Sequence, residues 1–260
     1  MKKYGLFVVF HQDLKRDYYD PSLLSSYIFV NVNPKNEAVA NYKDYKIINQ
    51  YEFNQFHSLG KWYTESEVIY NIYKNAYLYE DLDYLGFLQH DIDSSVLTAS
   101  KTDDLLTKVE HVNFQPYLFS TDYNQKILMD STQPNKKNGS GLNCYDVILE
   151  DYNAFYKTNY KLSDLSGKTI NLCASFILPK ETFKEMMQFI SSIIESGKLD
   201  NYDTLRQFRM QGGYLERYYA VWLAFKELQA TTVGLVHHFE RSTVQDSLLS
   251  RVLRKIGIRR

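Results

Sequence analysis

The stretch YLGFLQHDID, residues 84–93, decides how this chain is interpreted, because an apolar run ends abruptly on two carboxylates. A short apolar run bounded by polar residues is typical of a strand buried on both faces. Residues two apart in an extended segment point to the same side, so Asp91 and Asp93 should direct their oxygens at one point while Ile92 turns into the core. Oxygen ligands suit Mg²⁺ and Mn²⁺, and magnesium typically uses one or two carboxylates plus substrate phosphates. The stretch therefore predicts a divalent-cation and diphosphate site.

Around this stretch, short apolar runs alternate with segments of helical periodicity, which predicts an α/β sheet covered on both faces. The expected strands are 4–10, 27–32, the run from 84, 111–119 interrupted by Pro116, 169–178 and 231–236. The expected helices are 65–78, 143–157, one opened by Pro179 and stopped by Gly197, 202–210 and 214–228, with 96–108 helical or irregular.

Polar residues follow several of these predicted strands. Asp91 and Asp93 follow the run from 84, His11 follows the first strand, and His237 and His238 follow the last one. Ligands of α/β sheets gather at the carboxyl ends of strands. We therefore expect these side chains to line one site.

The composition, 44% hydrophobic and 23% charged over 260 residues, is that of a globular protein able to form one large domain. No apolar run reaches the roughly 20 residues that span a bilayer, and the N-terminus does not have the pattern of a signal peptide. We expect a cytoplasmic protein.

The last ten residues contain five basic residues and no acidic one, so the net charge of −1 leaves the rest of the chain acidic. This acidic body disfavours nucleic acid as a partner. Residues 246–256 have the spacing of a short amphipathic helix, within a basic tail over 246–260. Two interpretations stay open: peripheral contact with the inner membrane face, or packing of the apolar stripe on the domain.

Several segments together resemble the GT-A nucleotide-sugar glycosyltransferases, in particular the capsular-polysaccharide and lipopolysaccharide-type transferases of bacteria and large viruses. The matching pieces are the first strand ending on His11, residues 65–75 (ESEVIYNIYKN), the strand from 84, and residues 213–217 (GYLER). Relatives often continue the strand into His-Tyr-Arg-Arg where this chain has residues 90–93, HDID. That departure favours a metal-dependent donor site.

The resemblance implies one Rossmann-like GT-A domain over residues 1–245, with a mixed, mostly parallel sheet. The donor half would be about 1–119 and the acceptor half about 120–245. It implies Mn²⁺ or Mg²⁺ on Asp91 and Asp93, with His237 as the third ligand and a UDP-, GDP- or dTDP-sugar over the first strands. His11, Lys74 and Asn75 are the further donor-binding candidates, although a lysine on a helix is usually solvated. We expect the polar segment 120–141 to be a lid.

Glu216 is the candidate general base, because an inverting transfer needs a carboxylate opposite the leaving group. The alternative is an ion pair with Arg217 or Lys226 on a helix. Trp62, Trp222 and Arg217 are the candidate contacts to a glycan or glycolipid acceptor, while simple burial would also explain both tryptophans.

The sequence therefore predicts a metal-dependent glycosyltransferase, of hexosyl or deoxyhexosyl type and inverting, that acts in polysaccharide biosynthesis. Two alternatives stay open. A phosphohydrolase or nucleotidyltransferase would use the same aspartate pair, and a non-catalytic glycan-binding module would keep only the fold.

Overall fold

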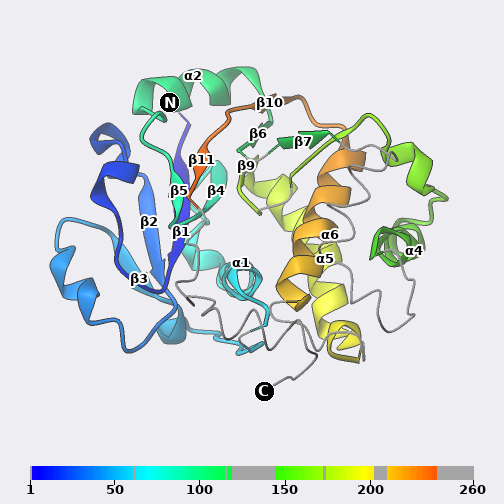
Figure 1. Ribbon diagram of the computed structural model, residues 1–260, viewed down its shortest axis with the longest axis horizontal. Helices are drawn as coiled ribbons and strands as arrows, with labels where there is room; N and C mark the ends of the chain where they lie inside the picture. The colour runs from blue at the N-terminus through cyan, green and yellow to red at the C-terminus, as the bar shows by residue number, and fades with distance from the viewer. Residues whose placement is uncertain are drawn as a thin grey trace, which may run out of the picture.

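The computed structural model describes residues 2–60, 62–114, 116–118, 144–171, 174–201 and 210–238. Its centre is a seven-stranded sheet in the order β10-β6-β9-β4-β1-β2-β3 (Figure 1). All neighbours are parallel except β9, which is antiparallel to both β4 and β6. The strands of this sheet are β1 (Tyr4–Phe10), β2 (Tyr27–Asn31), β3 (Ile47–Asn49), β4 (Tyr84–Gln89), β6 (His111–Asn113), β9 (Phe176–Pro179) and β10 (Ala230–Thr232). The predicted mixed, mostly parallel α/β sheet is confirmed.

The sheet is buried on both faces, as the alternation of side chains along β1 shows. Phe7 and Val9 belong to one hydrophobic cluster, whereas Leu6, Val8 and Phe10 belong to another. The first cluster contains the apolar faces of α1 (Glu65–Lys74), α4 (Cys144–Tyr156), α5 (Lys180–Glu195) and α6 (Met210–Lys226). The second contains tyrosines of the segment after β1 and a leucine of α2 (Ala99–Lys108). Many of the chain's tyrosines are therefore core residues.

Three predicted strands each divide between the main sheet and a smaller one. The segment 111–119 becomes β6 and β7 (Pro116–Leu118), and 169–178 becomes β8 (Thr169–Asn171) and β9. The last predicted strand becomes β10 and β11 (Val236–His237). β7 pairs with β8, and β11 pairs antiparallel with β5 (Ile92–Asp93). An apolar run in the sequence does not reveal where a strand leaves its sheet, and β3 is too short to have been predicted.

The predicted helix 65–78 ends four residues early. Asn75, the residue after α1, is buried, and its side-chain amide exchanges hydrogen bonds with the backbone N–H and C=O of Gln55 (3.0 and 2.8 Å). Asn71, one turn earlier, binds the backbone of His57 in the same way (2.7 and 2.9 Å). The two asparagines fasten the segment before α1 to the helix.

Residues 64–67 (TESE) have the sequence pattern of a capping box, but no such cap forms at the start of α1. Thr64 has φ 53° and ψ −134° and makes no side-chain cap. The Glu67 carboxylate instead accepts the backbone N–H groups of Leu59 and Gly60, at 2.7 and 2.9 Å, and the side-chain amide of Gln50. Glu67 therefore holds the segment before α1 against the helix and does not cap the helix.

The predicted lid 120–141, most of the predicted helix 202–210 and the basic tail 246–260 lie outside the described residues. Within the part of the chain that the structure describes, no helix is both long and apolar enough to cross a bilayer.

Candidate active site

The parallel strands place polar side chains at one edge of the sheet. In the register of the strands, Val9 is opposite Gln89, and Asn31 is opposite both Phe10 and Asn49. The residues at or just after the carboxyl ends of β1, β2, β3 and β4 are His11, Asn31, Asn33, Asn49, His90 and Asp91. This row is the polar edge that the parallel topology predicts for ligand binding.

Asp91 and His237 meet because β11 returns beside β5. The pairing aligns His237 with Ile92, and the His238 N–H donates to the backbone oxygen of Asp91 at 2.8 Å. His237 Nε2 lies 3.0 Å from Asp91 Oδ2, with side chains 8% and 19% exposed. The other carboxylate oxygen, Asp91 Oδ1, is buried and has no hydrogen-bond partner among the described residues. A buried carboxylate oxygen is costly to leave unpaired, so this atom marks where a further group belongs.

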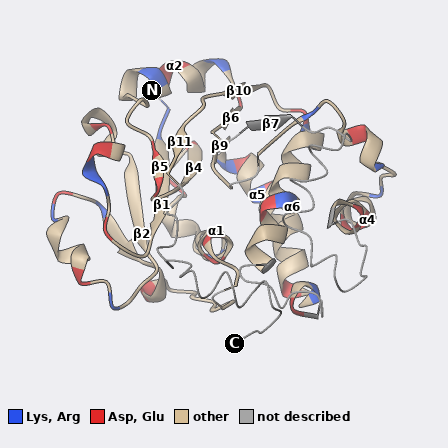
Figure 2. Cartoon of the chain, in the orientation of Figure 1, with Lys and Arg blue, Asp and Glu red and all other residues tan. Residues whose placement is uncertain are grey.

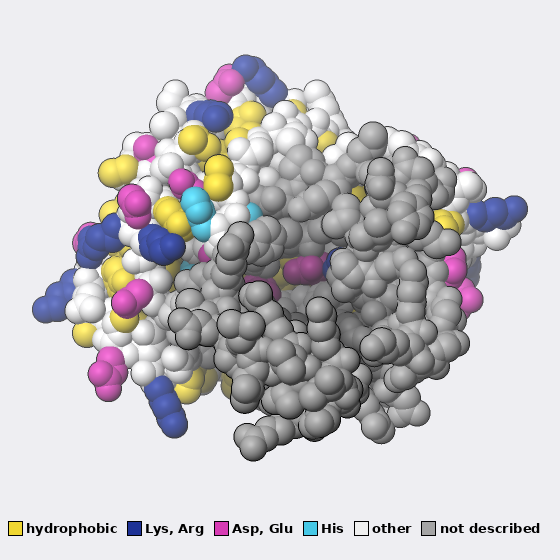
Figure 3. Space-filling model, viewed as in Figure 1, with side chains coloured by type: hydrophobic (Ala, Val, Ile, Leu, Met, Phe, Trp, Pro, Cys, Tyr) yellow, Lys and Arg dark blue, Asp and Glu magenta, His cyan; other side chains and the backbone are white. Residues whose placement is uncertain are grey.

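Asp93 and His238 form a second, looser pair. His238 Nε2 lies 4.0 Å from Asp93 Oδ2, and Asp93 Oδ1 accepts the Ser95 N–H at 2.9 Å. The His238 ring stacks on Tyr18, with centroids 4.8 Å apart. Ile92 between the two aspartates is fully buried, as predicted. Figure 3 shows histidine side chains reaching the surface beside β5 and β11, and Figure 2 shows acidic residues on β5 next to the uncharged central strands.

The ionisation of Asp91 depends on its histidine neighbours. Burial alone would raise the pKa of this carboxyl. The hydrogen bond and charge of His237, with a smaller contribution from His90, outweigh burial and leave the pKa of Asp91 below its usual value. Asp91 therefore presents a charged oxygen in a largely desolvated place.

His11 and His90 lie side by side at the start of this edge. Their rings meet edge to face with centroids 4.8 Å apart, and Gln12 Nε2 lies 3.1 Å from His90 Nε2. The Tyr19 hydroxyl donates to the backbone oxygen of His90 at 3.2 Å. The structure thus places the predicted site residue His11 against His90, which precedes Asp91 in the chain.

Three asparagines that the sequence analysis did not select complete the edge. Asn31 is 2% exposed, and its amide nitrogen donates to Asn49 Oδ1 at 3.1 Å and to the Asn33 backbone oxygen at 3.0 Å. Its oxygen accepts the Asn33 N–H at 3.1 Å. Asn31-Val32-Asn33 follows a strand in the way that Asp91-Ile92-Asp93 does, and that parallel was the available signal.

The residues fit a divalent cation in their donor chemistry. Asp91 and Asp93 supply oxygens, His237 and His238 supply imidazole nitrogens, and Asp91 Oδ1 is an orphaned buried carboxylate oxygen. Within the described residues, however, no three His, Cys, Asp or Glu side chains stand close enough together to hold an ion as they are. The roles of Asp91, Asp93 and His237 as ligands stay predictions.

Lys74 and Asn75 are not brought to this cluster. Lys74 Nζ pairs with Glu195 Oε1 of α5 at 2.6 Å, which raises the pKa of Lys74 and lowers that of Glu195. Asn75 is committed to the backbone of Gln55 and precedes β4, whereas Asp91 follows that strand. Their predicted donor contacts are therefore not supported by their positions.

Glu216 and Arg217 lie on α6. Glu216 is 24% exposed, and its Oε2 is 3.2 Å from Arg217 Nη1, so the predicted neighbouring ion pair forms. Arg217 is buried, and Nη1 also donates to the Gly213 backbone oxygen at 2.7 Å. No described interaction joins this pair to the Asp91 cluster.

The two tryptophans differ. Trp222 is 1% exposed, its indole N–H donates to the Tyr156 hydroxyl at 2.8 Å, and its ring packs in the helical core. The structure thus places Trp222 in the core, and its predicted contact with an acceptor stays a prediction. Trp62 is half-buried in the segment before α1, and its backbone oxygen accepts the Gly212 N–H at 2.9 Å. Its predicted acceptor contact stays a prediction.

Comparison with known proteins defines the fold. No model of a known protein family matches the chain, and no curated protein is significantly similar to it in sequence. Among solved structures, the chain resembles the WbbM bifunctional glycosyltransferase in its apo form, with a TM-score of 0.59 and 12% identity. The match covers 90% of this chain but only 44% of that one.

Weaker likenesses are to glucosyl-3-phosphoglycerate synthase from Mycobacterium tuberculosis, in complex with Mn²⁺, uridine diphosphate and phosphoglyceric acid, and to the Saccharomyces cerevisiae mannosyltransferase Ktr4p. Their TM-scores are 0.39 and 0.40 at 9% and 12% identity, covering 100% and 91% of this chain and 80% and 70% of theirs. The likeness to WbbM, together with the mixed, mostly parallel sheet, shows that the chain has the GT-A fold.

Proposed function

We propose that this protein is a metal-dependent glycosyltransferase that moves a sugar from a nucleoside-diphosphate donor to a hydroxyl of a glycan or glycolipid acceptor. The observation that carries the proposal is Asp91 Oδ1, a buried carboxylate oxygen without a described partner at the carboxyl end of β4. Asp93 and two histidines lie beside it. Such a charged, desolvated oxygen suits a divalent cation better than a neutral ligand.

Asp91, Asp93 and His237 would hold Mn²⁺ or Mg²⁺, and the cation would supply positive charge to the departing diphosphate. In the structure His237 Nε2 lies against Asp91 Oδ2. When the cation is bound, this ring nitrogen would bind the cation instead of the carboxylate. His11 and the asparagines at the ends of β2 and β3 would line the nucleoside, which needs neutral donors and acceptors for its base and ribose.

Glu216 would take the proton from the acceptor hydroxyl. The acceptor oxygen would then attack the sugar carbon from the side opposite the departing diphosphate, which gives inversion at that carbon. The partial exposure of Glu216 leaves its carboxylate accessible, and Arg217 stabilises the charged form. The basic tail and a cytoplasmic, membrane-surface location stay predictions from the sequence.

The proposal is tested by thermal unfolding with UDP, GDP and dTDP, each with and without Mn²⁺. We expect one nucleotide to raise the midpoint only when Mn²⁺ is present, because a ligand at about 100 times its Kd adds about 2.7 kcal/mol of stability. Asp91→Asn should abolish the shift, and Asp104→Asn, an exposed aspartate on α2 paired with Lys108, should keep it.

Product analysis separates the alternatives. Release of nucleoside diphosphate from the matching nucleotide sugar supports glycosyl transfer, whereas release of nucleoside monophosphate would favour a nucleotidyltransferase or phosphohydrolase. No shift with any nucleotide would contradict the proposal.

A further inference from the structure

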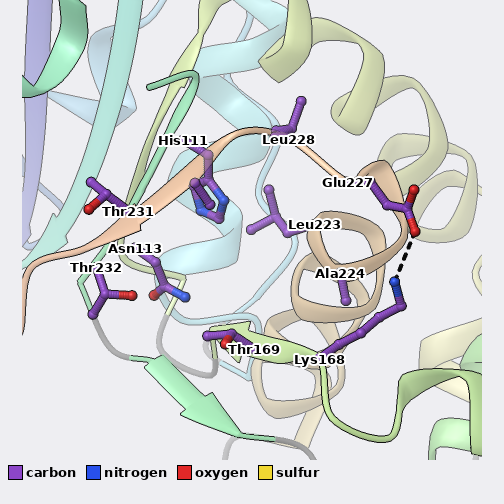
Figure 4. A pocket seen from close by; sticks show the side chains of 11 residues that line it. His111, Asn113, Lys168, Thr169, Leu223, Ala224, Glu227, Leu228, Thr231 and Thr232 are labelled. Atoms are coloured by element: carbon purple, nitrogen blue, oxygen red, sulfur yellow. Dashed lines mark hydrogen bonds and ion pairs between the residues drawn. The ribbon is translucent and has the colours of Figure 1, made fainter. Parts of the chain in front are cut away.

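A polar cavity lies under the carboxyl half of α6 (Figure 4), and no residue of the Asp91 cluster lines it. Its volume is about 410 Å³, within the range of about 300–1,000 Å³ of small-molecule pockets. It is formed by β6, β10, the start of β8 and the last turns of α6. The lining residues used below are His111, Asn113, Thr232, Leu223 and Ala224.

The cavity contains a buried imidazole without a described partner. His111 on β6 is 5% exposed, and its Nε2 makes no hydrogen bond to any described residue. Figure 4 shows its ring among the residues that line the cavity. Leaving a buried ring nitrogen unpaired costs free energy, so this atom points to a group that the cavity is shaped to receive.

The lining is electrically neutral. Lys168 Nζ lies 3.1 Å from Glu227 Oε1, so the two charges at the rim offset each other. Burial lowers the pKa of His111 to about 4, so the imidazole is uncharged at neutral pH. A neutral imidazole and a threonine hydroxyl each match a group that both donates and accepts hydrogen bonds, which is what a hydroxyl does.

One wall of the cavity is apolar and the opposite side is polar. Leu223 and Ala224 of α6 form the apolar wall, while Thr232 and Asn113, which are paired in the register of β10 and β6, carry a hydroxyl and an amide group. A ligand that matches both sides needs hydroxyls on its edge and C–H groups on a face. A pyranose ring has this combination.

The cavity is distinct from the candidate active site. Asn113 pairs with Phe176, which pairs with Phe87 of β4. Asp91 follows Phe87 by four residues, roughly 13 Å at the rise of a strand, and one strand, β9, separates β4 from β6.

From these features we infer that the cavity around His111 is a second binding site, which takes an uncharged, hydroxyl-rich ligand of the size of a monosaccharide. The His111 imidazole binds one hydroxyl, Thr232 of β10 binds another, and the ring's C–H face lies on Leu223 and Ala224. The inference does not depend on the proposed transferase activity, because none of its residues belongs to the Asp91 cluster.

The test is saturation-transfer NMR with methyl α-D-glucoside, methyl α-D-mannoside, methyl α-L-rhamnoside and N-acetylglucosamine, in the presence of UDP and Mn²⁺. We expect at least one sugar to receive saturation from the wild-type protein. His111→Phe and Ala224→Leu should weaken its binding about fivefold or more, because they remove a hydrogen bond or narrow the cavity. His111→Gln, which keeps an amide near the Nε2 position, should retain most of the binding.

The controls separate this site from the candidate active site and from misfolding. Asp91→Asn combined with Asp93→Asn should leave the signal unchanged, and loss of the signal there would overturn the inference. Circular dichroism checks each variant, and Thr232→Val replaces His111→Phe if the latter does not fold. The inference also fails if no neutral sugar binds, if glucuronate binds better than all of them, or if the cavity variants bind as well as the wild type.

Discussion

The Asp91 cluster and the His111 cavity each contain one buried polar atom without a described hydrogen-bond partner. Burial pushes both groups toward their neutral forms. Asp91 resists this because His237 and His90 favour its charged form, whereas His111 has no such neighbour and loses its charge. The cost of burying a charge acts on both residues, but the Asp91 cluster is charged and the His111 cavity is uncharged.

This contrast explains which ligand each region can select. A desolvated carboxylate beside imidazoles attracts a cation, and a neutral imidazole among hydroxyls does not. α6 bears on both proposals, because its first half carries the proposed base Glu216 and its last turns form the apolar wall of the cavity.

The largest expected effect is the loss of sugar transfer when the charges of the Asp91 cluster are removed. Asp91→Asn and Asp93→Asn should each lower kcat/KM for sugar transfer by about 10³-fold or more, since a cation contributes several kcal/mol to charge stabilisation. His111→Gln should change it by less than about threefold. Nucleoside diphosphate release, measured at several Mn²⁺ concentrations, checks both. Equal losses in the two regions would show that the regions are not independent.

Glu216→Gln should lower kcat by about 10³-fold, as expected for removal of a general base, while the nucleotide-dependent rise in melting temperature stays unchanged. The matched control is Glu185→Gln on α5, whose carboxylate pairs with Lys226 at 2.6 Å. If Glu216→Gln retains wild-type kcat, the Glu216–Arg217 pair is structural and the base lies elsewhere.

The uncharged state of His111 predicts how stability depends on pH. The folded pKa is about 4 and the ordinary value about 6.5, so between these values the unfolded chain binds more protons. The free energy of unfolding should fall as the pH is lowered from 6.5 toward 4, by about 3 kcal/mol from this group. Urea unfolding of the wild type and His111→Gln at pH 7.5 and 4.5 measures the difference. Identical pH dependence in both proteins would contradict a buried neutral imidazole.

The sequence predicted the parts of the molecule that depend on local pattern. The buried strand before Asp91, the helix opened by Pro179 and the alternation of strands and helices all follow from apolar periodicity. The polar ends of the strands followed from topology, which predicted that His11, Asp91 and His237 lie at one edge. The structure places His237 beside Asp91 and His11 beside His90, and their roles as ligands stay predictions.

The sequence could not predict what depends on the partner of each side chain. Nothing in the order of residues shows that Asn75 binds the backbone of Gln55, or that Trp222 is enclosed by the helices. His111 was not selected either, because a histidine inside an apolar run looks the same whether or not a cavity adjoins it. Only packing between β6, β10 and α6 distinguishes the two cases.

The smallest expected effect concerns α6, which carries Glu216 and the apolar wall of the cavity. A Cβ at Gly212 would lie 2.3 Å from Thr64 Oγ1 and 3.0 Å from the Tyr63 backbone oxygen, whereas one at Gly213 would approach nothing closer than 3.9 Å. Gly212→Ala should therefore destabilise the fold by about 2 kcal/mol, because α6 must move away from the segment before α1. Gly213→Ala should stabilise it by about 0.5–1 kcal/mol through helix propensity.

Urea unfolding of both alanine variants measures these changes. If α6 couples the regions, Gly212→Ala also weakens both nucleotide-dependent stabilisation and sugar binding, while Gly213→Ala weakens neither. An effect on only one of the two would show that the opposite ends of α6 are fixed separately, by α1 at its start and by β8 near its end.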